Sequence, residues 1–348
     1  MSRGALTVLR LALIALIAAS GGAACTNGTE RSSKPSEAAT GDSTTKPTVT
    51  STETRPAVTT PFARPRPISA PYEPPAKEPY VNGKRLAGRV AQELATFGPG
   101  ASATELASRV DAAGERPAEL ERIVVPLLNP ARRSTGEVVY VQLSGVTATT
   151  LGTMVLVRQR LENAEGNTEL VVRVMDVRLR RTDGPWSLDR VASVGGTAVP
   201  RPANVSSAAA RVLDHPGIWL PDTARWDIYR GLVDEGLLQA LGDAADQSPF
   251  AVTVLRTGHP PNVWATRRPS AHAAGRAADI YAVDSTLVLR QRTNGSSAHQ
   301  LAAAFLAAGA RQVGSPWILP PGGKRSFTDR AHQDHVHVQR TPTPQPRR

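Results

Sequence analysis

The feature that most constrains the fold of this chain is a pair of short alternating segments that carry histidine and aspartate. Residues 277–283, Ala-Ala-Asp-Ile-Tyr-Ala-Val, alternate and end in β-forming residues, so they are predicted to form a strand. Residues 335–338, His-Val-His-Val, alternate in the same way, which places both histidines on one side of a sheet and both valines on the core side. We therefore expect two strands that direct polar side chains into one cleft.

The polar residues in and around these segments form a candidate metal site. His272 lies on the loop that enters the first strand, seven residues before Asp279. Together with His337 they supply three ligands, the number that a catalytic zinc ion usually takes from the protein. His332 and His335 would remain free to handle protons. A histidine-rich tract can also be a solvated face or an adventitious metal binder, but the two motifs together favour one bound Zn²⁺.

The two motifs resemble those of a known family. Ser-x-His-x-x-Gly-x-Ala-x-Asp at residues 270–279, followed by His-x-x-His-x-His at residues 332–337, is similar to the LAS group of zinc metallopeptidases. That group contains D-alanyl-D-alanine carboxypeptidases, dipeptidases and murein endopeptidases, and hedgehog-type domains share its fold. The resemblance covers residues 208–340 and implies an α/β zinc peptidase domain with a small antiparallel sheet.

The resemblance also implies roles for the remaining residues of the motifs. The reaction would be hydrolysis of peptidoglycan stem or cross-link peptides near D-alanine. His335 or His332 would be the general base, and Asp334 is the third candidate because other members carry Glu-x-x-His at this point. The family has an arginine on the strand before the first motif, where it would stabilise the oxyanion or hold a substrate carboxylate. Arg256 occupies the comparable place in this chain. Ser270 and His259, which lies on a long polar connection expected to form one wall of the cleft, are the other candidate substrate-binding residues.

A function of another class stays open at this point. A zinc-stabilised module that binds cell-wall fragments without turnover would need the metal only for folding. The spare histidines and Arg256 favour an enzyme, because a structural zinc needs neither. A peptidase of nutrient peptides or proteins would differ only in its substrate, and the sequence does not distinguish a carboxypeptidase from a dipeptidase or an endopeptidase.

The beginning of the chain is predicted to direct export. Arg3 and Arg10 are followed by a short apolar core and by small residues that lead to Cys25, the only cysteine. The apolar run is too short for a transmembrane helix and is typical of a cleavable signal. The position of Cys25 resembles that of the lipidated cysteine of bacterial lipoproteins, although Gly22 stands where an aliphatic residue is usual. We expect a signal peptide over residues 1–25 and a lipid anchor in the outer face of the plasma membrane, with soluble secretion as the alternative.

Composition assigns the flanking segments and excludes one class of partner. Residues 26–79 are rich in Ser, Thr and Pro and are predicted to be a disordered tether, and residues 341–348 a disordered tail. The net charge of +11 favours an anionic envelope surface or polymer, although it can also reflect an arginine-rich genome. Dispersed basic residues and an aromatic content of 4% argue against a nucleic-acid partner.

Residues 80–202 are predicted to form an α+β accessory domain. It lies between the tether and the peptidase domain, which is placed at residues 207–340. Helical spacing comes first and four strand-like runs follow, which indicates an antiparallel sheet with helices on one face. The order of elements faintly resembles cystatin-like cone folds. No catalytic constellation is visible here, so the region is interpreted as a binding module with an unknown partner or as a spacer. The expected helices span 86–97, 103–112 and 118–127, and the expected strands 137–143, 152–160, 169–180 and 186–194.

Overall fold

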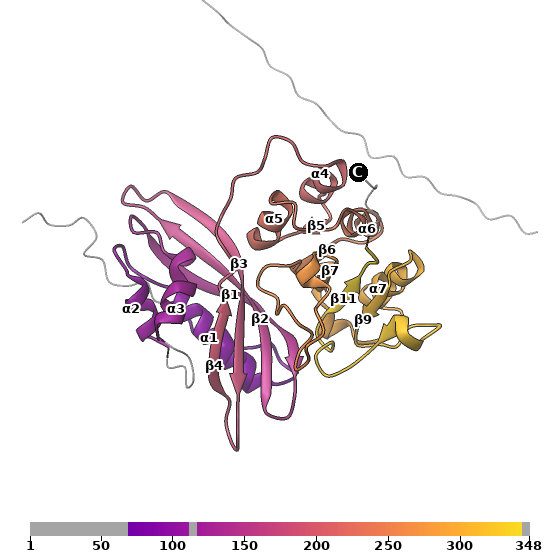
Figure 1. Cartoon of the computed structure of the whole chain (residues 1–348), viewed down its shortest axis with the longest axis horizontal. Helices are drawn as coiled ribbons and strands as arrows, with labels where there is room; N and C mark the ends of the chain where they lie inside the picture. Colours follow the sequence, from indigo (N-terminus) through magenta and orange to yellow (C-terminus); the bar gives the residue numbers. More distant parts are fainter. Residues whose placement is uncertain (1–68, 111–116, 343–348) are drawn as a thin grey trace, which may run out of the picture. The chain divides into compact units, whose positions relative to one another are not determined.

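The described part of the chain contains both helices and sheets and has an α+β fold, as Figure 1 shows for the computed structural model. The structure describes residues 69–110 and 117–342. The predicted signal peptide, Cys25 and most of the predicted tether and tail lie outside these ranges. None of the helices within them has both the length and the apolar character that crossing a bilayer requires.

The first sheet is a four-stranded antiparallel meander preceded by helices. Its strands pair in chain order, β1-β2-β3-β4, as the sequence predicted for the accessory region. The strands are β1 (Arg133–Val146), β2 (Thr150–Glu162), β3 (Thr168–Arg180) and β4 (Ser187–Ser193). The preceding helices are α1 (Val81–Ala95), α2 (Ala103–Ser108) and α3 (Pro117–Val124), followed by the short η1 (Val125–Leu127).

Both faces of the first sheet are covered, each by a different part of the chain. Val141 and Leu143 of β1 belong to the core that the sheet shares with α1, α2 and α3. Tyr140 and Gln142 point to the opposite face because successive residues of a strand alternate. There Tyr140 stacks on Tyr281 of the second sheet, with ring centroids 5.4 Å apart. The predicted accessory region and the predicted peptidase region therefore share a buried interface.

The second sheet is mixed and carries the candidate site. Its strand order is β10-β9-β11-β7-β6-β5, with β8 paired to β7. The central pairs are antiparallel, as expected for a small antiparallel sheet, and the outer pairs β9-β10 and β5-β6 are parallel. The strands are β5 (Ile218–Trp219), β6 (Phe250–Val254), β7 (Ala277–Val283), β8 (Thr286–Leu287), β9 (Gln312–Gly314), β10 (Ser326–Phe327) and β11 (Val336–Gln339).

Helices cover one face of the second sheet, and the other face carries the site residues beside an apolar cluster around Tyr281. Ile280 of β7 and Val338 of β11 pack into a core with the apolar sides of the helices. Asp279 and His337, on the same two strands, therefore project from the opposite face, which is the face that meets the first sheet. The helices are α4 (Ser207–Asp214), α5 (Asp222–Tyr229), α6 (Glu235–Ala245) and α7 (Ser297–Ala307).

Residues 69–79, which composition assigns to the tether, lie against α1. The Tyr72 backbone N–H donates to the side-chain oxygen of Gln92, 3.0 Å away, and Glu78 forms a buried ion pair with Lys84. The predicted end of the tether at residue 79 is therefore too late. Composition missed these contacts because the partners of this proline-rich segment belong to the helix that follows it.

Candidate metal centre

The structure brings together the three side chains that the sequence predicted as metal ligands. His272 Nε2 lies 3.1 Å from Asp279 Oδ1 and 3.2 Å from His337 Nδ1. The separation between His337 Nδ1 and Asp279 Oδ1 is 2.9 Å. Two ligand atoms bound to one tetrahedral zinc ion at the usual distances lie about 3.3 Å apart. The spacing of the three atoms therefore fits the donor set of a single zinc ion.

Strand register and one turn produce this convergence. His337 of β11 pairs directly with Asp279 of β7, and residues opposite each other on antiparallel strands direct their side chains to the same face. His272 begins the short helix η2 (His272–Ala274), which ends at Gly275 with a φ of 66°. A Cβ at Gly275 would lie 2.0 Å from the Leu232 carbonyl oxygen, so this tight turn into β7 requires glycine.

His272 and Asp279 each form a hydrogen bond to a residue outside the cluster, and this leaves one metal-binding atom free on each side chain. His272 Nδ1 is 2.7 Å from the Leu255 carbonyl oxygen. Because a carbonyl can only accept, Nδ1 carries the ring proton and Nε2 presents its lone pair to the cluster. The Gln142 amide donates to Asp279 Oδ2 across 2.8 Å, which leaves Oδ1 for the cluster.

The local electrostatics favour the metal-binding protonation states. Burial lowers the pKa of His337 to about 4, so its ring is neutral at pH 7. Burial alone would raise the pKa of Asp279, but His272 and His335 hold that pKa well below its usual value. Neutral imidazole and ionised carboxylate are the forms that bind metals.

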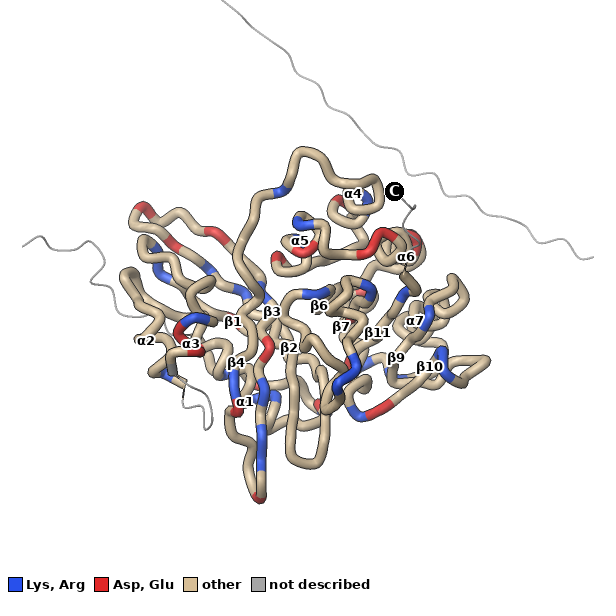
Figure 2. Tube along the Cα trace, in the orientation of Figure 1, with Lys and Arg blue, Asp and Glu red and all other residues tan. Residues whose placement is uncertain are grey.

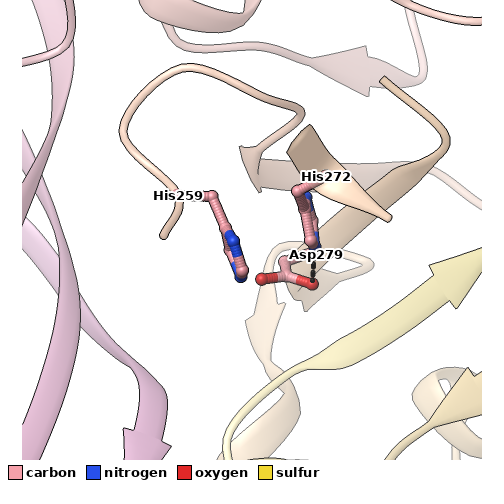
Figure 3. Close-up of side chains that lie close together, drawn as sticks. All are labelled: His259, His272 and Asp279. Carbon is pink, nitrogen blue, oxygen red and sulfur yellow. Dashed lines mark hydrogen bonds and ion pairs between the residues drawn. The ribbon is translucent and has the colours of Figure 1, made fainter. Parts of the chain in front are cut away.

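His259 offers an alternative third donor. His259, His272 and Asp279 each present a ligand atom within 4.8 Å of the other two, and Figure 3 shows the two rings side by side above the carboxylate. The rings are stacked, with centroids 3.9 Å apart and planes 15° apart. Lone pairs of imidazole nitrogens lie in the ring plane, so stacked rings direct them along parallel lines rather than at one point. We therefore assign the third position to His337 and place His259 in the wall of the pocket, which it lines.

Two further histidines lie beside the cluster, and each has an acidic partner. His335 Nδ1 is 2.8 Å from Asp334 Oδ1, and its Nε2 is 3.9 Å from Asp279 Oδ1. His332 Nδ1 is 2.7 Å from Asp329 Oδ1, and the His332 ring lies 5.0 Å from that of His335 between centroids. Both rings line the same pocket, which is the position expected of residues that move protons.

Asp334 occupies a different place from that expected of a general base. It is fully buried and is not among the residues that line the pocket. Its Oδ1 faces His335, while Oδ2 accepts from Lys84 Nζ at 2.6 Å and from the Leu143 backbone N–H at 3.0 Å. Asp334 therefore holds the His335 ring and has no oxygen directed at the pocket.

Ser270 lines the pocket, whereas Arg256 does not. Arg256 Nε donates to the Ala273 carbonyl at 3.1 Å, and Arg256 does not line the pocket. In this structure it supports the loop that carries His272. Ser270 does line the pocket, and its hydroxyl accepts from the His272 backbone N–H at 3.3 Å.

The pocket has a cavity volume of about 840 Å³ and is bordered by both sheets. The end of β1 and the following turn, residues 144–147, supply one wall. Four arginines also line it, and none of their guanidinium groups forms an ion pair with an acidic residue in the described ranges. Elsewhere Lys and Arg are spread along the trace rather than gathered on one element (Figure 2). The four arginines of the pocket are Arg268, Arg276, Arg311 and Arg330.

Comparisons with known proteins identify no relative: no family model matches the chain, and no curated protein or solved structure is significantly similar to it. The function is therefore inferred from the geometry of the site. Sequence reasoning missed Gln142, Lys84 and Asp329 as partners of site residues. The one sequence signal for Gln142 is that it is a polar residue between two apolar residues of a strand, Val141 and Leu143.

Proposed function

We propose that this chain is a zinc-dependent peptidase that acts on peptidoglycan peptides near D-alanine. The observation that carries the proposal is the convergence of His272 Nε2, Asp279 Oδ1 and His337 Nδ1 within 3.2 Å of one another. When bound there, zinc would polarise the scissile carbonyl and lower the pKa of a water molecule towards about 7.

The two spare histidines would move the protons of the reaction. Contact with Asp334 keeps a proton on His335 Nδ1, so Nε2 is free to accept a proton from the attacking water. Burial lowers the pKa of His335, but the charges of Asp279 and Asp334 outweigh this and raise it, which helps the ring to hold that proton. His335 would then return this proton to the leaving amine, with His332, oriented by Asp329, as the alternative base.

The substrate class follows from the charge of the pocket. Four arginines without ion-pair partners in the described ranges line it, and guanidinium groups pair well with carboxylates. Peptides with free carboxylates, such as peptidoglycan stems and D-alanine termini, carry the matching charge. A location in the cell envelope, with a lipid anchor at Cys25, would place the enzyme beside this substrate.

The experiment combines metal analysis with digestion. The full chain would be loaded with zinc and incubated with purified muropeptides and with a peptide that ends in D-alanyl-D-alanine. An otherwise identical peptide ending in L-alanyl-L-alanine is the control. Products are identified by mass. We expect cleavage of the D-peptides alone, and its loss in a chelator.

Variants separate the roles of the histidines. His272→Ala, Asp279→Ala and His337→Ala should each lose zinc and turnover, whereas His259→Ala should keep zinc. His335→Ala should keep zinc and lose about 10²–10⁴ in rate, the usual contribution of a general base. Zinc retained in all three ligand variants rejects the site. A wild type that binds zinc and wall peptides without cleaving any of them supports a binding module instead.

A further inference from the structure

We infer that the first sheet and its helix α1 complete the metal centre, with Gln142 and Lys84 acting as positioning residues for Asp279 and His335. The region that composition suggests is an accessory module would then be part of the catalytic site itself. The inference rests on the zinc site of the proposed function but not on its peptidase activity. Two independent sets of hydrogen bonds carry it, one from β1 and one from α1.

The first link runs from β1 to the aspartate of the metal cluster. Gln142 is fully buried, and its Nε2 lies 2.8 Å from Asp279 Oδ2. Its Oε1 accepts from the Thr253 hydroxyl at 2.5 Å. An ionised carboxylate can only accept, so the amide must turn its NH₂ group towards Asp279, and Thr253 fixes that orientation. Gln142 therefore holds the carboxylate so that Oδ1 alone faces the two histidines.

The second link runs from α1 through Asp334 to His335. Lys84 Nζ lies 2.6 Å from Asp334 Oδ2, and both side chains are fully buried. The same ammonium group contacts Glu78, so it joins two carboxylates that have no access to solvent. With Oδ2 occupied by Lys84 and by the Leu143 N–H, the remaining oxygen of Asp334 is available only to His335. Lys84 thereby fixes the rotamer of the residue that orients the His335 ring.

These contacts have the form of outer-shell support at a metal site. Partners that orient first-shell ligands usually change metal affinity or activity by about 10–100-fold when they are removed. The two links predict different losses. Gln142 acts on a ligand, so its removal should weaken zinc binding. Lys84 acts on a residue outside the ligand set, so its removal should slow turnover while zinc stays bound.

The first arm of the experiment measures zinc affinity by competition with a chromogenic chelator in the full chain. Gln142→Met keeps the size of the side chain and removes both hydrogen bonds. We expect its zinc dissociation constant to rise about 10–100-fold. Gln159→Met is the matched control, because Gln159 is also a fully buried glutamine of the first sheet but bonds to Arg173 and Ser134 instead of the site. The control should lose stability without a change in zinc affinity.

The second arm measures kcat and KM on the zinc-loaded chain. Lys84→Met should lower kcat by about 10–100-fold with KM and zinc content unchanged. Arg173→Met is its control, since Arg173 is a buried cation of β3 whose guanidinium lies over Trp226. If Lys84→Met yields no folded protein, Asp334→Asn tests the same link, because it keeps the shape and removes an accepting oxygen.

The outcomes distinguish this inference from the proposed function. A Gln142→Met variant with zinc affinity within twofold of the wild type overturns the inference, as does an equal loss in Gln159→Met. If the wild type binds zinc but cleaves no peptide, the proposed function fails, and the first arm still decides the role of Gln142. A wild type that binds no zinc rejects both.

Discussion

Replacing Lys84 by methionine should destabilise the fold in a manner that depends on pH. Lys84 and its partners Glu78 and Asp334 are all buried without exposed side-chain surface. Removal of one member of a buried ion pair usually costs about 3–5 kcal/mol, because the remaining charge is left uncompensated. We therefore expect the free energy of unfolding to fall by about 3–5 kcal/mol at pH 7.

The pH dependence follows from the signs of the pKa shifts. In the wild type, burial raises the pKa of Asp334, but Lys84 and His335 lower it overall. Asp334 therefore stabilises the fold above its unfolded pKa of about 3.9, and this contribution is lost as the pH falls through the folded pKa. Without Lys84, both buried carboxyl groups should have pKa values above their unfolded values. Such groups destabilise the fold increasingly as the pH rises, by about 1.4 kcal/mol per unit of pKa shift. The difference between Lys84→Met and wild type should therefore be smaller at pH 4 than at pH 7.

Urea unfolding at several pH values, with a chelator present so that metal binding does not contribute, measures this difference. The control is Lys324→Met, which removes an exposed lysine and should change stability by less than about 0.5 kcal/mol. A loss at pH 4 as large as that at pH 7 would show that Lys84 contributes packing rather than charge. A loss below about 1 kcal/mol at pH 7 would contradict the buried network itself.

Two further predictions concern single sites. A Cβ at Gly314 would lie 2.6 Å from Phe327 Cζ and 2.7 Å from His332 Cδ2, so Gly314→Ala should lower stability by about 1–3 kcal/mol and displace His332. Turnover by Gly314→Ala should fall more than its zinc affinity. Gly98→Ala is the control, because a Cβ at Gly98 would meet no atom within 4 Å, and parallel assays should show its turnover and zinc affinity unchanged. Cys25→Ser should release the protein from membranes in a fractionation assay; a variant that stays membrane-bound and uncleaved would indicate an ordinary anchor.

Local patterns in the sequence predicted most of the regular elements. The strand expected over residues 277–283 has these same bounds in the structure, and the run expected over 169–180 begins one residue earlier. The first helix, expected over 86–97, begins five residues earlier at Val81. Its first turn contains Asn, Gly, Lys and Arg, so apolar periodicity starts only at Leu86. The turn that the pattern missed is the one that carries Lys84 to Asp334.

The candidate ligands were predictable because their spacing is local, whereas their supporting residues were not. His272 and Asp279 lie within one turn and strand, and His337 pairs with Asp279 in the neighbouring strand. Gln142 is 137 residues from Asp279, and Lys84 is 250 residues from Asp334. Gln142 is a polar residue of a strand and Lys84 a polar residue of a helix. The local sequence pattern around them does not indicate which residue each one contacts. Such pairs become visible only when the packing of the two sheets is known.

The burial of polar residues between the sheets has a consequence for how the site is assembled. Asp334 and Asp279 have almost no exposed surface. Lys84 of α1 balances the charge of Asp334, and the amide of Gln142 in the first sheet donates to Asp279. Separated from that sheet, the second sheet would expose the apolar surface around Tyr281 and lose the donors that fix both carboxylates. Ionised groups that lose their hydrogen-bonding partners rotate towards water. The ligand geometry thus depends on docking of the two sheets, and a fragment beginning near residue 207 should bind zinc more weakly than the full chain.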